Sequence, residues 1–423
     1  MSYLVPVDTK GILEANRAKG DRNLFLEFNK FIYEWQWDDS SNNYKLGNEK
    51  KNILKKLSDG NYATANKTLE YQVKRNKTAI DEFKKYGNED EVGKVVNLET
   101  QWRLAVGVGS SGPLETGMTL HHLYGYPYIP ATSVKGIARA AAYLLDEELC
   151  GLRLQIFNNY IEKLETKEFV LKGEFEKLKQ ELTYEEKNTD GERVKKTPTE
   201  DEYKIIRDNF CKLENIRCVF GSQSSVGAVT FFDGLPETFP KLDVDVLSPH
   251  YGKYYMNDGT YPGDWMQPVP SFFLTVAPNT KFGFSFYASC NPKRYKGFGL
   301  LPKNVIEMTK TWLVEGLKQL GIGGKTSSGY GYFEYPLERE GLKPPKQSFE
   351  ITSKQLKKDE AIAEIISLDK KPYKVKIENI EGIFDCSGLN PSGLKLSIRS
   401  KIIVSLNYDN KLKKVISCKY SRG

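Results

Sequence analysis

The feature that most constrains this fold is the order of strand-like and helix-like runs between residues 98 and 337. Short runs of strand length alternate with two longer runs that have helical spacing. In chain order they predict a strand at Trp102–Val108, a helix capped by Thr132 or Ser133 and ending at Leu145, a strand at Val226–Phe232, a hairpin of Phe272–Val276 and Phe282–Ala288, a helix at Asn304–Leu320 and a strand at Tyr330–Tyr335.

Once insertions are allowed for, the order is β-α-β-β-α-β, which is typical of an α+β domain with the ferredoxin-like, or RNA-recognition-type, layout. The flanking residues predict further parts. Residues 1–97 have helical spacing and predict a helical N-terminal region, whereas 151–217 are rich in Lys and Glu and predict a helical insertion, mobile near 187–198. Residues 338–358 resemble a linker, and 359–423 predict a small, barrel-like all-β module.

Composition narrows the partners and the compartment. Lys and Arg outnumber Asp and Glu by 62 to 55, giving a formal net charge of +7, which mildly favours a polyanionic partner. No stretch is apolar enough for a membrane helix, and the first residues lack the segments of a signal peptide, so we expect a cytoplasmic protein without membrane contact. The six cysteines contain no C-x-x-C pair and predict reduced thiols and no metal site.

Two glycine patterns resemble nucleotide-binding motifs but lack their context. Gly107–Gly112 fits G-x-G-x-x-G, yet Pro113 follows where a helix should begin. Gly324-Lys325-Thr326 resembles the end of a P-loop, but Gln319 stands where the first glycine belongs, and the loop leads from a helix to a strand. We therefore expect no nucleotide cofactor.

Two other segments carry chemistry suited to RNA. Gly321–Gly331 combines five glycines with Lys325 and three hydroxyl side chains, which can offer amides, a cation and hydroxyls to phosphate and ribose oxygens. His121–Arg139 brings basic side chains to a helix N-terminus, where free amides and the helix dipole favour an anion. Each segment also fits a plain structural role: a flexible turn after a helix C-cap, and a capped helix with solvated basic residues.

These segments resemble the motifs of a known family. Pro127–Gly136, preceded by Leu114–Gly117 and followed far downstream by Gly321–Gly331, is similar to the RAMP superfamily of CRISPR proteins, which are built on ferredoxin-like domains and bind CRISPR RNA. One branch of that family supplies subunit six of the Cmr, or type III-B, effector complex. The residues that resemble this branch are Asp245–Tyr251, Tyr254, Tyr255, Asp264, Trp265 and Pro268.

The resemblance implies a non-catalytic subunit that caps the filament of RNA-cleaving backbone subunits near the 3′ end of the guide. The implied partners are the CRISPR guide RNA and, through it, the target RNA, with the RNA-cleaving backbone subunit, the small helical subunit and an adjacent end-capping RAMP subunit. A guide is bound through its backbone because its bases must pair with the target. By motif position, the guide would contact Thr132, Ser133, Lys135, Gly136, Arg139, Gly323, Gly324, Lys325, Thr326, Ser327 and Ser328.

The alternative is a metal-free, guide-processing endoribonuclease, because other members of the superfamily cleave RNA with a histidine near the first helix. His121, His122 and Tyr124 lie in that neighbourhood, and histidine can act as base or acid near neutral pH. Neighbours in an extended loop usually point in opposite directions, however, so we favour a loop that contacts RNA without cleaving it. A metal-dependent nuclease is less favoured, because the acidic pair Asp243 and Asp245 has no accompanying histidine.

The strand-like runs of residues 359–423 include Tyr373–Ile377 and Leu394–Ile398, in which apolar residues alternate with Lys, Arg or Ser. This alternation predicts a half-buried sheet, and lysine on exposed strands also discourages edge-to-edge pairing. The strands lack the paired aromatic residues of an RNA-stacking platform. We therefore expect this module to dock on a neighbouring subunit or on the N-terminal region rather than to bind RNA independently.

Overall fold

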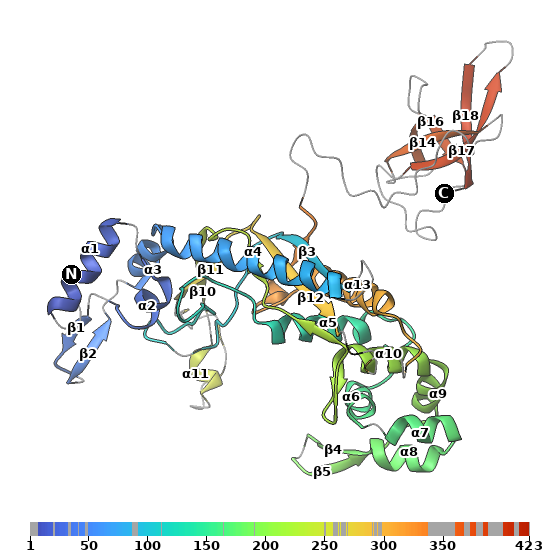
Figure 1. The fold of residues 1–423 in the computed structure, drawn as a ribbon, viewed down its shortest axis with the longest axis horizontal. Helices are drawn as coiled ribbons and strands as arrows, with labels where there is room; N and C mark the ends of the chain where they lie inside the picture. The colour runs from blue at the N-terminus through green and yellow to red at the C-terminus, as the bar shows by residue number, and fades with distance from the viewer. Residues whose placement is uncertain are drawn as a thin grey trace. The chain divides into compact units, whose positions relative to one another are not determined.

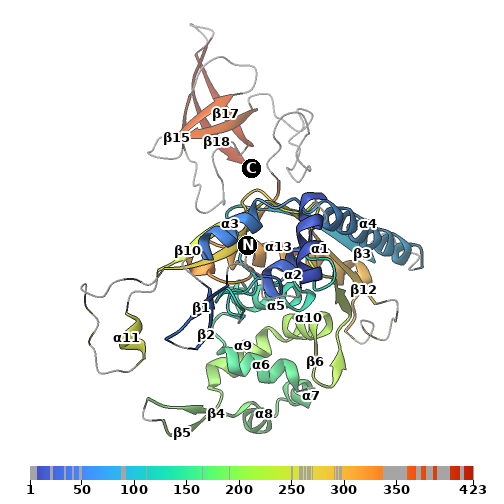
Figure 2. The same cartoon turned by 90° about the vertical axis from the view of Figure 1, so that its left-hand side faces the viewer.

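The chain forms two compact units, Met1–Leu337 and Glu338–Gly423. Figures 1 and 2 draw a computed structural model from two directions. It describes residues 7–336 except 20–21, 33–34, 41, 47–49, 87–91, 111, 164, 190, 249–250, 257–260, 262, 264–267, 269, 290, 292–293 and 295–297, and five strands between 360 and 422.

The first unit is built around an antiparallel sheet with the strand order β13-β3-β12-β8. The strands are β3 (Gly93–Thr100), β8 (Val229–Phe231), β12 (Lys281–Ala288) and β13 (Phe333–Glu334), and β9 (Leu235–Pro236) pairs with the start of β12. If these four strands are numbered by their order in the chain, their order across the sheet is fourth, first, third, second. Helix α5 (Ala131–Leu144) connects the first strand toward the second, and α13 (Pro302–Gln319) connects the third to the fourth.

The two faces of this sheet are covered by different helices. On one face, Val96 and Leu98 of β3 lie beside Phe284 and Phe282 of β12, and Lys94 on the same face bonds Glu307 of α13 at 2.6 Å. These apolar side chains are buried, as the period of two predicts for one face of a strand. Helix α4 (Ala63–Tyr86) covers the other face, where Phe83 stacks on Tyr287 with ring centroids 4.0 Å apart.

Two predictions of strand position and pairing were wrong. The first strand of the sheet is Gly93–Thr100, earlier than the predicted Trp102–Val108, which makes only a bridge from Leu104 to Val276. The predicted hairpin of Phe272–Val276 with Phe282–Ala288 does not form, because the turn between them redirects the chain. Asn279 adopts a left-handed φ of 58° and its N–H bonds the carbonyl of Thr100 at 2.8 Å, which carries β12 onto β3.

Strand β11 (Ser271–Val276), which does not pair with β12, pairs instead with β10 (Leu242–Leu247). These two strands form a separate two-stranded sheet, which we call the arm. The short helix α11 (Gly252–Tyr255) lies between these strands in sequence. At the N-terminus, α1 (Val7–Lys19), α2 (Leu24–Asn29) and α3 (Lys50–Ser58) precede α4, and α3 packs on the arm. A hairpin of β1 (Trp35–Asp38) and β2 (Asn43–Leu46) interrupts these helices, so this region is not helical throughout.

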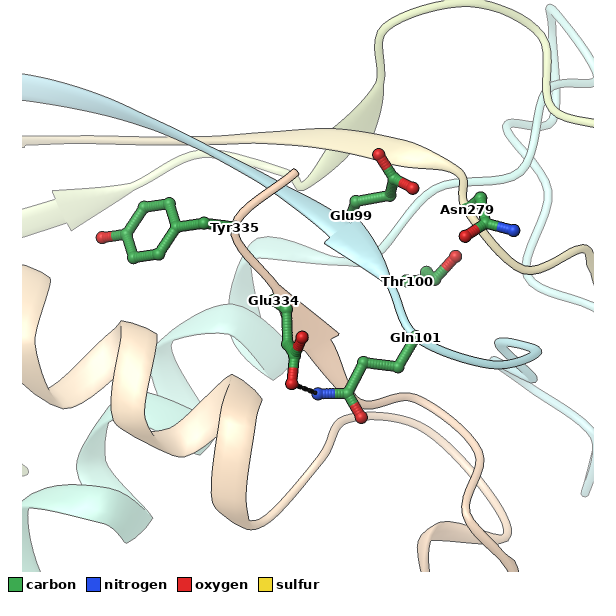
Figure 3. Close-up of a pocket in the computed structure, with 6 residues that line it drawn as sticks. All are labelled: Glu99, Thr100, Gln101, Asn279, Glu334 and Tyr335. Atoms are coloured by element: carbon green, nitrogen blue, oxygen red, sulfur yellow. Dashed lines mark hydrogen bonds between the residues drawn. The ribbon is translucent and has the colours of Figure 1, made fainter. Parts of the chain in front are cut away.

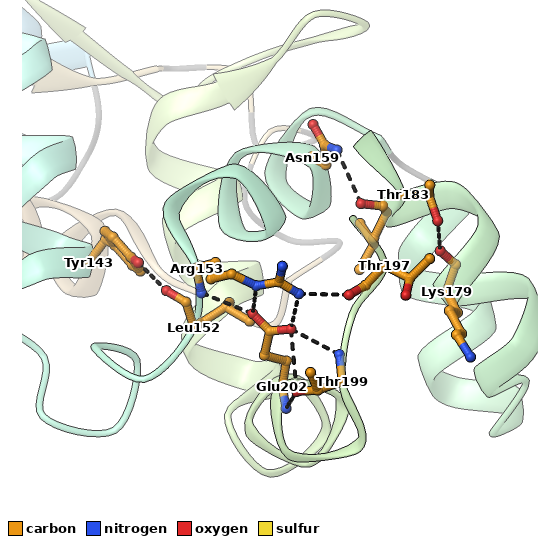
Figure 4. Close-up of polar contacts among 10 residues, drawn as sticks. Tyr143, Leu152, Arg153, Asn159, Lys179, Thr183, Thr197, Thr199 and Glu202 are labelled. Atoms are coloured by element: carbon orange, nitrogen blue, oxygen red, sulfur yellow. Dashed lines mark hydrogen bonds and ion pairs between the residues drawn. The ribbon is translucent and has the colours of Figure 1, made fainter. Parts of the chain in front are cut away.

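The insertion contains α6 (Leu154–Glu162), α7 (Glu165–Lys172), α8 (Phe175–Leu182), α9 (Glu200–Asp208) and α10 (Phe210–Phe220). Its middle forms an exposed hairpin of β4 (Tyr184–Lys187) and β5 (Arg193–Lys196), a structure that the sequence did not predict. Figure 4 shows how Arg153 joins the hairpin's end to α9: its guanidinium donates to both carboxylate oxygens of Glu202, at 2.7 and 2.6 Å, and to the carbonyl of Thr197. A small hairpin of β6 (Gly221–Ser222) and β7 (Ser225–Val226) follows α10.

The second unit is a closed five-stranded barrel with the order β14-β15-β16-β18-β17. Its strands are β14 (Glu360–Ser367), β15 (Tyr373–Ile377), β16 (Phe384–Ser387), β17 (Lys401–Asp409) and β18 (Lys414–Arg422). Strand β16 was not predicted, and its parallel pairing with β18 joins distant parts of the unit. The predicted strand at Leu394–Ile398 and the linker at 338–358 lie outside the described residues.

Candidate nucleic-acid interface

Helix α5 begins two or three residues earlier than expected, and neither Thr132 nor Ser133 caps it. Pro130 is the N-cap and supplies no side-chain hydrogen bond. The N–H of Ala131 instead donates to Oδ1 of Asp233 at 2.7 Å, from the turn between β8 and β9. A carboxylate therefore already lies at the positive end of this helix, a favourable place for an acidic side chain.

Lys135 and Arg139 lie one turn apart on α5, as the spacing predicts, and both are half-buried. Burial lowers the pKa of the Lys135 ammonium, the charge of Arg139 lowers it further, and Glu162 opposes the shift. Burial also lowers the pKa of Arg139, again against the effect of Glu162. The two cations are thus held together in a partly desolvated place with little compensating negative charge.

The guanidinium of Arg139 has incomplete partners. Its Nη2 atom is 3.7 Å from Oε1 of Glu162 in α6, and its centre lies 5.6 Å from the ring of Phe157. Within the described part of the chain, Nη2 is buried without a hydrogen-bond partner. Buried polar groups are nearly always hydrogen-bonded, so the charge of this guanidinium is only partly satisfied within the described chain, while 30% of the side chain stays accessible.

The neighbouring Gly136 has no internal packing role. Thr132 and Gly136 are exposed and Ser133 is half-buried on the first turns of α5. A Cβ atom added at Gly136 would meet nothing within 4 Å. Glycine inside a helix costs about 0.5–1 kcal/mol relative to alanine. Because no contact within the chain requires the missing side chain, Gly136 leaves the helix backbone open to another molecule.

The glycine-rich loop after α13 is shaped by the segment that follows β3. The N–H groups of Gly324 and Gly331 donate to the carbonyls of Ala105 and Arg103 at 2.7 and 2.9 Å. Gly323 has a φ of 92°, and a Cβ atom there would lie 2.5 Å from the carbonyl oxygen of Ala105. The chain can approach so closely only with glycine, which explains part of the loop's composition without reference to a ligand.

Lys325 points into a cluster of side chains within the protein. Its ammonium lies 4.9 Å from the ring centre of Phe273 in β11 and 5.4 Å from that of Tyr330. The hydroxyl of Tyr330 donates to Asp245 of β10, which also accepts from Arg103 at 2.8 Å. These contacts bind the loop to the arm. The more accessible hydroxyls belong to Ser327 and Ser328 of the 3₁₀ turn η1 (Thr326–Ser328), whereas Thr326 and Gly324 are half-buried.

The charges in this cluster follow from its contacts. Burial would raise the pKa of Asp245, but hydrogen bonds from Tyr330 and from the N–H of Val246, with the nearby charges of Arg103 and Lys325, lower it. Burial and the bond to Asp245 raise the pKa of Tyr330 to about 12. Asp243 and Asp245 both pair with Arg103, at 3.4 and 2.8 Å. No group of three or more possible metal ligands occurs among the described residues.

The segment His121–Tyr124, which we call the histidine loop, contains stacked aromatic rings. His121 lies between His122 and Tyr124, with ring centroids 5.3 and 4.6 Å away, so the two histidines do not point in opposite directions as expected. The Nδ1 atom of His121 accepts the N–H groups of Leu123 and Tyr124, both at 3.3 Å. Burial lowers the pKa of His121, and the charge of His122 adds to this effect while Asp233 opposes it.

The structure connects the predicted segments through shared neighbours. Asp233 lies beside both the start of α5 and the ring of His121. Gly316, in the last turn of α13 before the glycine-rich loop, packs closely on the carbonyl of Ile137, the residue after Gly136. Sequence reasoning missed Asp233 and Arg103. The only local sign for Asp233 was its place in an Asp-Gly turn, and none singled out Arg103.

An open pocket on the edge of β3 and β13 is acidic, in contrast to the basic face of α5. Figure 3 shows its lining, in which Gln101 donates to Oε1 of Glu334 at 2.5 Å. Glu99 lies directly opposite Glu334 in the strand register. Two carboxylates make this pocket unsuitable for phosphate.

In the part of the chain that the structure describes, no helix combines the length and apolar character needed to cross a membrane.

Known proteins match this chain at the level of family and fold. The family model of the RAMP superfamily matches residues 97–334, a range that includes both predicted RNA-contacting segments. The CRISPR system Cmr subunit Cmr6 of Pyrococcus furiosus is 31% identical over 346 residues, covering 73% of this chain and 93% of that protein.

Two solved structures are also similar. A chain of the type III-B Cmr-beta complex bound to cognate target RNA has a TM-score of 0.38 and 20% identity, over 67% of this chain and 70% of that chain. The crystal structure of Cmr6 from Pyrococcus furiosus has a TM-score of 0.29 and 25% identity, over 57% of this chain and 97% of that chain.

Proposed function

The chain belongs to the RAMP superfamily, and from this premise we propose that it is a non-catalytic, RNA-binding subunit of a type III-B CRISPR effector complex. It caps the filament of backbone subunits near the 3′ end of the guide RNA. The identity of 31% to Cmr6 over 73% of this chain supports the assignment to this complex. The sheet order of fourth, first, third and second strand supports a ferredoxin-like core.

One observation carries the RNA-binding part of the proposal: the cation pair of Lys135 and Arg139 has less negative charge around it than it needs. Both side chains are half-buried on one face of α5, and Nη2 of Arg139 is buried without a hydrogen-bond partner in the described chain. A phosphate supplies negative charge and several acceptor oxygens at once. A backbone phosphate that reaches the exposed part of these side chains, which is 30% for Arg139, would supply the missing negative charge.

The surrounding groups fit the same ligand. Gly136 leaves the backbone of α5 accessible, and Thr132, Ser327 and Ser328 offer exposed hydroxyl groups. Amides, hydroxyls and cations bind phosphate and sugar without reading the bases. A guide RNA must be held in this way, because its bases pair with the target. Lys325 then acts by fixing the loop against Phe273 and Tyr330, next to the RNA path.

The partners of the proposed subunit are the guide RNA and, through it, the target RNA. Protein partners are the RNA-cleaving backbone subunit, the small helical subunit and the adjacent end-capping RAMP subunit. The histidine loop, with its exposed His122, contacts RNA or a neighbouring subunit without taking part in cleavage.

A salt titration of Lys135→Ala tests the RNA site. Binding of two unrelated labelled RNAs would be measured at several salt concentrations, with Lys172→Ala as control, because Lys172 is 61% exposed and pairs with Glu168 far along the insertion. Loss of one phosphate contact should weaken both RNAs alike and make the salt slope shallower by roughly 0.7. Wild-type affinity and slope in Lys135→Ala would contradict the proposal.

The nuclease alternative needs a separate test. General base catalysis requires a free ring nitrogen near the 2′-hydroxyl, but Nδ1 of His121 already accepts two backbone N–H groups. We expect the purified chain to leave a labelled guide precursor intact in metal-free buffer. Site-specific cleavage that disappears in the His121→Ala, His122→Ala double variant would replace our proposal by the endoribonuclease.

A further inference from the structure

Helix α4 has an outward face whose composition its packing does not explain. Its inner face is apolar: Leu69 and Ile80 are buried, and Phe83 stacks on Tyr287 of the sheet. Figure 1 shows α4 as a long helix lying along the outside of the sheet. The positions pointing away from the sheet, which we call the α4 stripe, are Lys67, Tyr71, Lys74, Arg75 and Thr78.

The α4 stripe is strongly basic. Lys67, Lys74 and Arg75 are exposed and fall within about 12 Å along the helix, given a rise of about 1.5 Å per residue. None of these three has an ion-pair partner among the described residues. Glu70 lies to the side of the stripe, where it accepts a hydrogen bond from Asn66 at 2.7 Å. Three positive charges without an ion pair are thus gathered, with the single carboxylate of Glu70 one turn from both Lys67 and Lys74.

An exposed aromatic ring lies among these charges. Tyr71 is 66% exposed and is four residues from both Lys67 and Arg75, so a cation flanks it on each side along the helix. The packing of α4 on the sheet does not require a large ring at this exposed position. Cations that follow a backbone, with an aromatic ring on which a base can stack, are the combination used to bind single-stranded nucleic acid.

We infer that the α4 stripe is a second RNA-binding surface, separate from the site at α5. It binds a single-stranded RNA segment through three phosphate contacts and stacks one unpaired base on Tyr71. This inference rests on the proposed function, since it assigns a further RNA segment to the same subunit. The two sites are separate because α4 covers one face of the sheet, whereas α13, with α5 packed on it, covers the other.

The first test removes the charges. We would compare the variant Lys67→Ala, Lys74→Ala, Arg75→Ala with a matched control, Lys172→Ala, Lys177→Ala, Arg207→Ala. The control residues are 61%, 62% and 55% exposed on α7, α8 and α9, and each is paired with a carboxylate. Both variants lose three positive charges, so their net charge is equal. Only the position of the lost charge differs.

Binding of a labelled single-stranded RNA would be measured across a salt series. The α4 variant should bind about 10- to 100-fold more weakly near ~0.1 M salt, with a salt slope shallower by roughly 2. The control should keep wild-type affinity and slope within the small effect of net charge. Equal behaviour of the two variants would overturn the inference, because the position of the charge would then have no effect.

The second test concerns the ring. Tyr71→Phe keeps the stacking surface and should keep wild-type affinity, whereas Tyr71→Ala should weaken binding by about 5- to 100-fold. Since Tyr71 is 66% exposed, neither change should alter the unfolding transition, and this can be checked on the same samples. Unchanged affinity in Tyr71→Ala would remove the base-stacking part of the inference.

These outcomes separate this inference from the proposed function. Failure of the wild-type chain to bind RNA would contradict both. If Lys135→Ala weakens RNA binding and the α4 variant does not, the result contradicts only the second surface. An α4 variant that binds RNA normally but no longer joins the effector complex would assign the stripe to an acidic protein partner and overturn the RNA assignment.

Discussion

The carboxylate of Asp233 accepts a hydrogen bond of 2.7 Å from the N–H of Ala131, the first residue of α5. Next to this contact, Ile129 and Gly234 exchange two backbone hydrogen bonds, of 2.9 and 2.8 Å. The start of α5 is thereby fixed to the turn between β8 and β9. The position of Lys135 and Arg139 depends on this attachment, because both side chains project from the helix that it anchors.

We expect Asp233→Ala to lower the free energy of unfolding by about 1 kcal/mol, the usual effect of losing a helix cap. Asp233→Asn retains an acceptor oxygen and should lose less. Urea unfolding of both variants would measure the difference. RNA affinity should not fall in Asp233→Asn, because that change removes a negative charge near the proposed phosphate site. Equal stability of wild type and Asp233→Ala would show that the contact does not anchor α5.

Gly136→Ala should separate stability from RNA binding. The added Cβ meets nothing within 4 Å, so the variant should unfold with about 0.5–1 kcal/mol more free energy. The same methyl group would obstruct an RNA backbone and weaken binding. Gly331→Ala is the contrasting variant: its φ is 75° and the added atom would overlap the carbonyl of Ile322, so it should be destabilised. Unchanged RNA affinity in Gly136→Ala would argue against close backbone approach.

Glu202 should make the insertion sensitive to acid. Burial would raise its pKa, but hydrogen bonds from Arg153 and Thr199 outweigh that effect and lower the pKa to about 2. The unfolded-state value is about 4.3, so the stabilisation is complete above that pH and is lost as pH falls toward the folded value. It amounts to about 3 kcal/mol at most.

The pH dependence of urea unfolding tests this expectation. Wild type should lose stability relative to Glu202→Gln between about pH 4.3 and pH 2. Glu200→Gln, an exposed change in the same helix turn, serves as control and should follow the wild-type profile. A constant difference between wild type and Glu202→Gln across this window would show that the carboxylate contributes no acid-dependent stability.

The insertion also contains a buried ion pair. Arg217 is only 2% exposed and donates to Glu214 at 2.6 Å, while its Nε bonds the carbonyl of Ile161 at 3.1 Å. Arg217→Met removes the nearer counter-charge of the buried Glu214, leaves only Lys167 at 3.6 Å, and should destabilise the chain by about 3 kcal/mol. The double variant with Glu214→Gln should be more stable than the single variant. Thermal unfolding of both would decide, and an equally unstable double variant would contradict charge burial as the cause.

Deletion of residues 338–423 should leave a folded RNA-binding unit. Met1–Leu337 is compact by itself and contains the sheet, its covering helices and both proposed RNA surfaces. We therefore expect the truncated chain to retain its cooperative unfolding and most of its RNA affinity, while joining the effector complex less well. Calorimetry, RNA binding and co-purification measure the three properties. Normal assembly with a large loss of RNA affinity would instead assign the main RNA contacts to the barrel.

Local patterns predicted the elements better than they predicted their partners. The apolar spacing at Asn304–Leu320 located α13, which runs from Pro302 to Gln319, because side chains on one helix face interact along the chain itself. The strand β12, Lys281–Ala288, was also predicted to within one residue, as Phe282–Ala288. Its assumed pairing with Phe272–Val276 was wrong, since a strand's partner depends on distant residues, and here the bond between Asn279 and Thr100 selected β3.

The same distinction applies to the site. The residue types in Thr132–Arg139 and Gly321–Gly331 suggested anion binding, and the structure places these segments on α5 and directly after α13, two helices that pack on each other. Their individual surroundings could not be foreseen. Lys325 resembled a free phosphate ligand in the sequence, but its ammonium lies over Phe273, a residue of the separate arm. The cap of α5 comes from Asp233, which is 102 residues from the amide that it binds.

The sequence by itself determined the kinds and order of the central elements, the basic character of the chain and the family motifs. Each of these depends on composition or on residues that are neighbours in the chain. Only the tertiary structure decided which strands pair, which carboxylate lies beside each cation and which glycine faces open space. These properties depend on groups far apart in the chain, such as Arg139 of α5 and Glu162 of α6. Their distances are set by packing of the whole unit, and no local pattern contains that information.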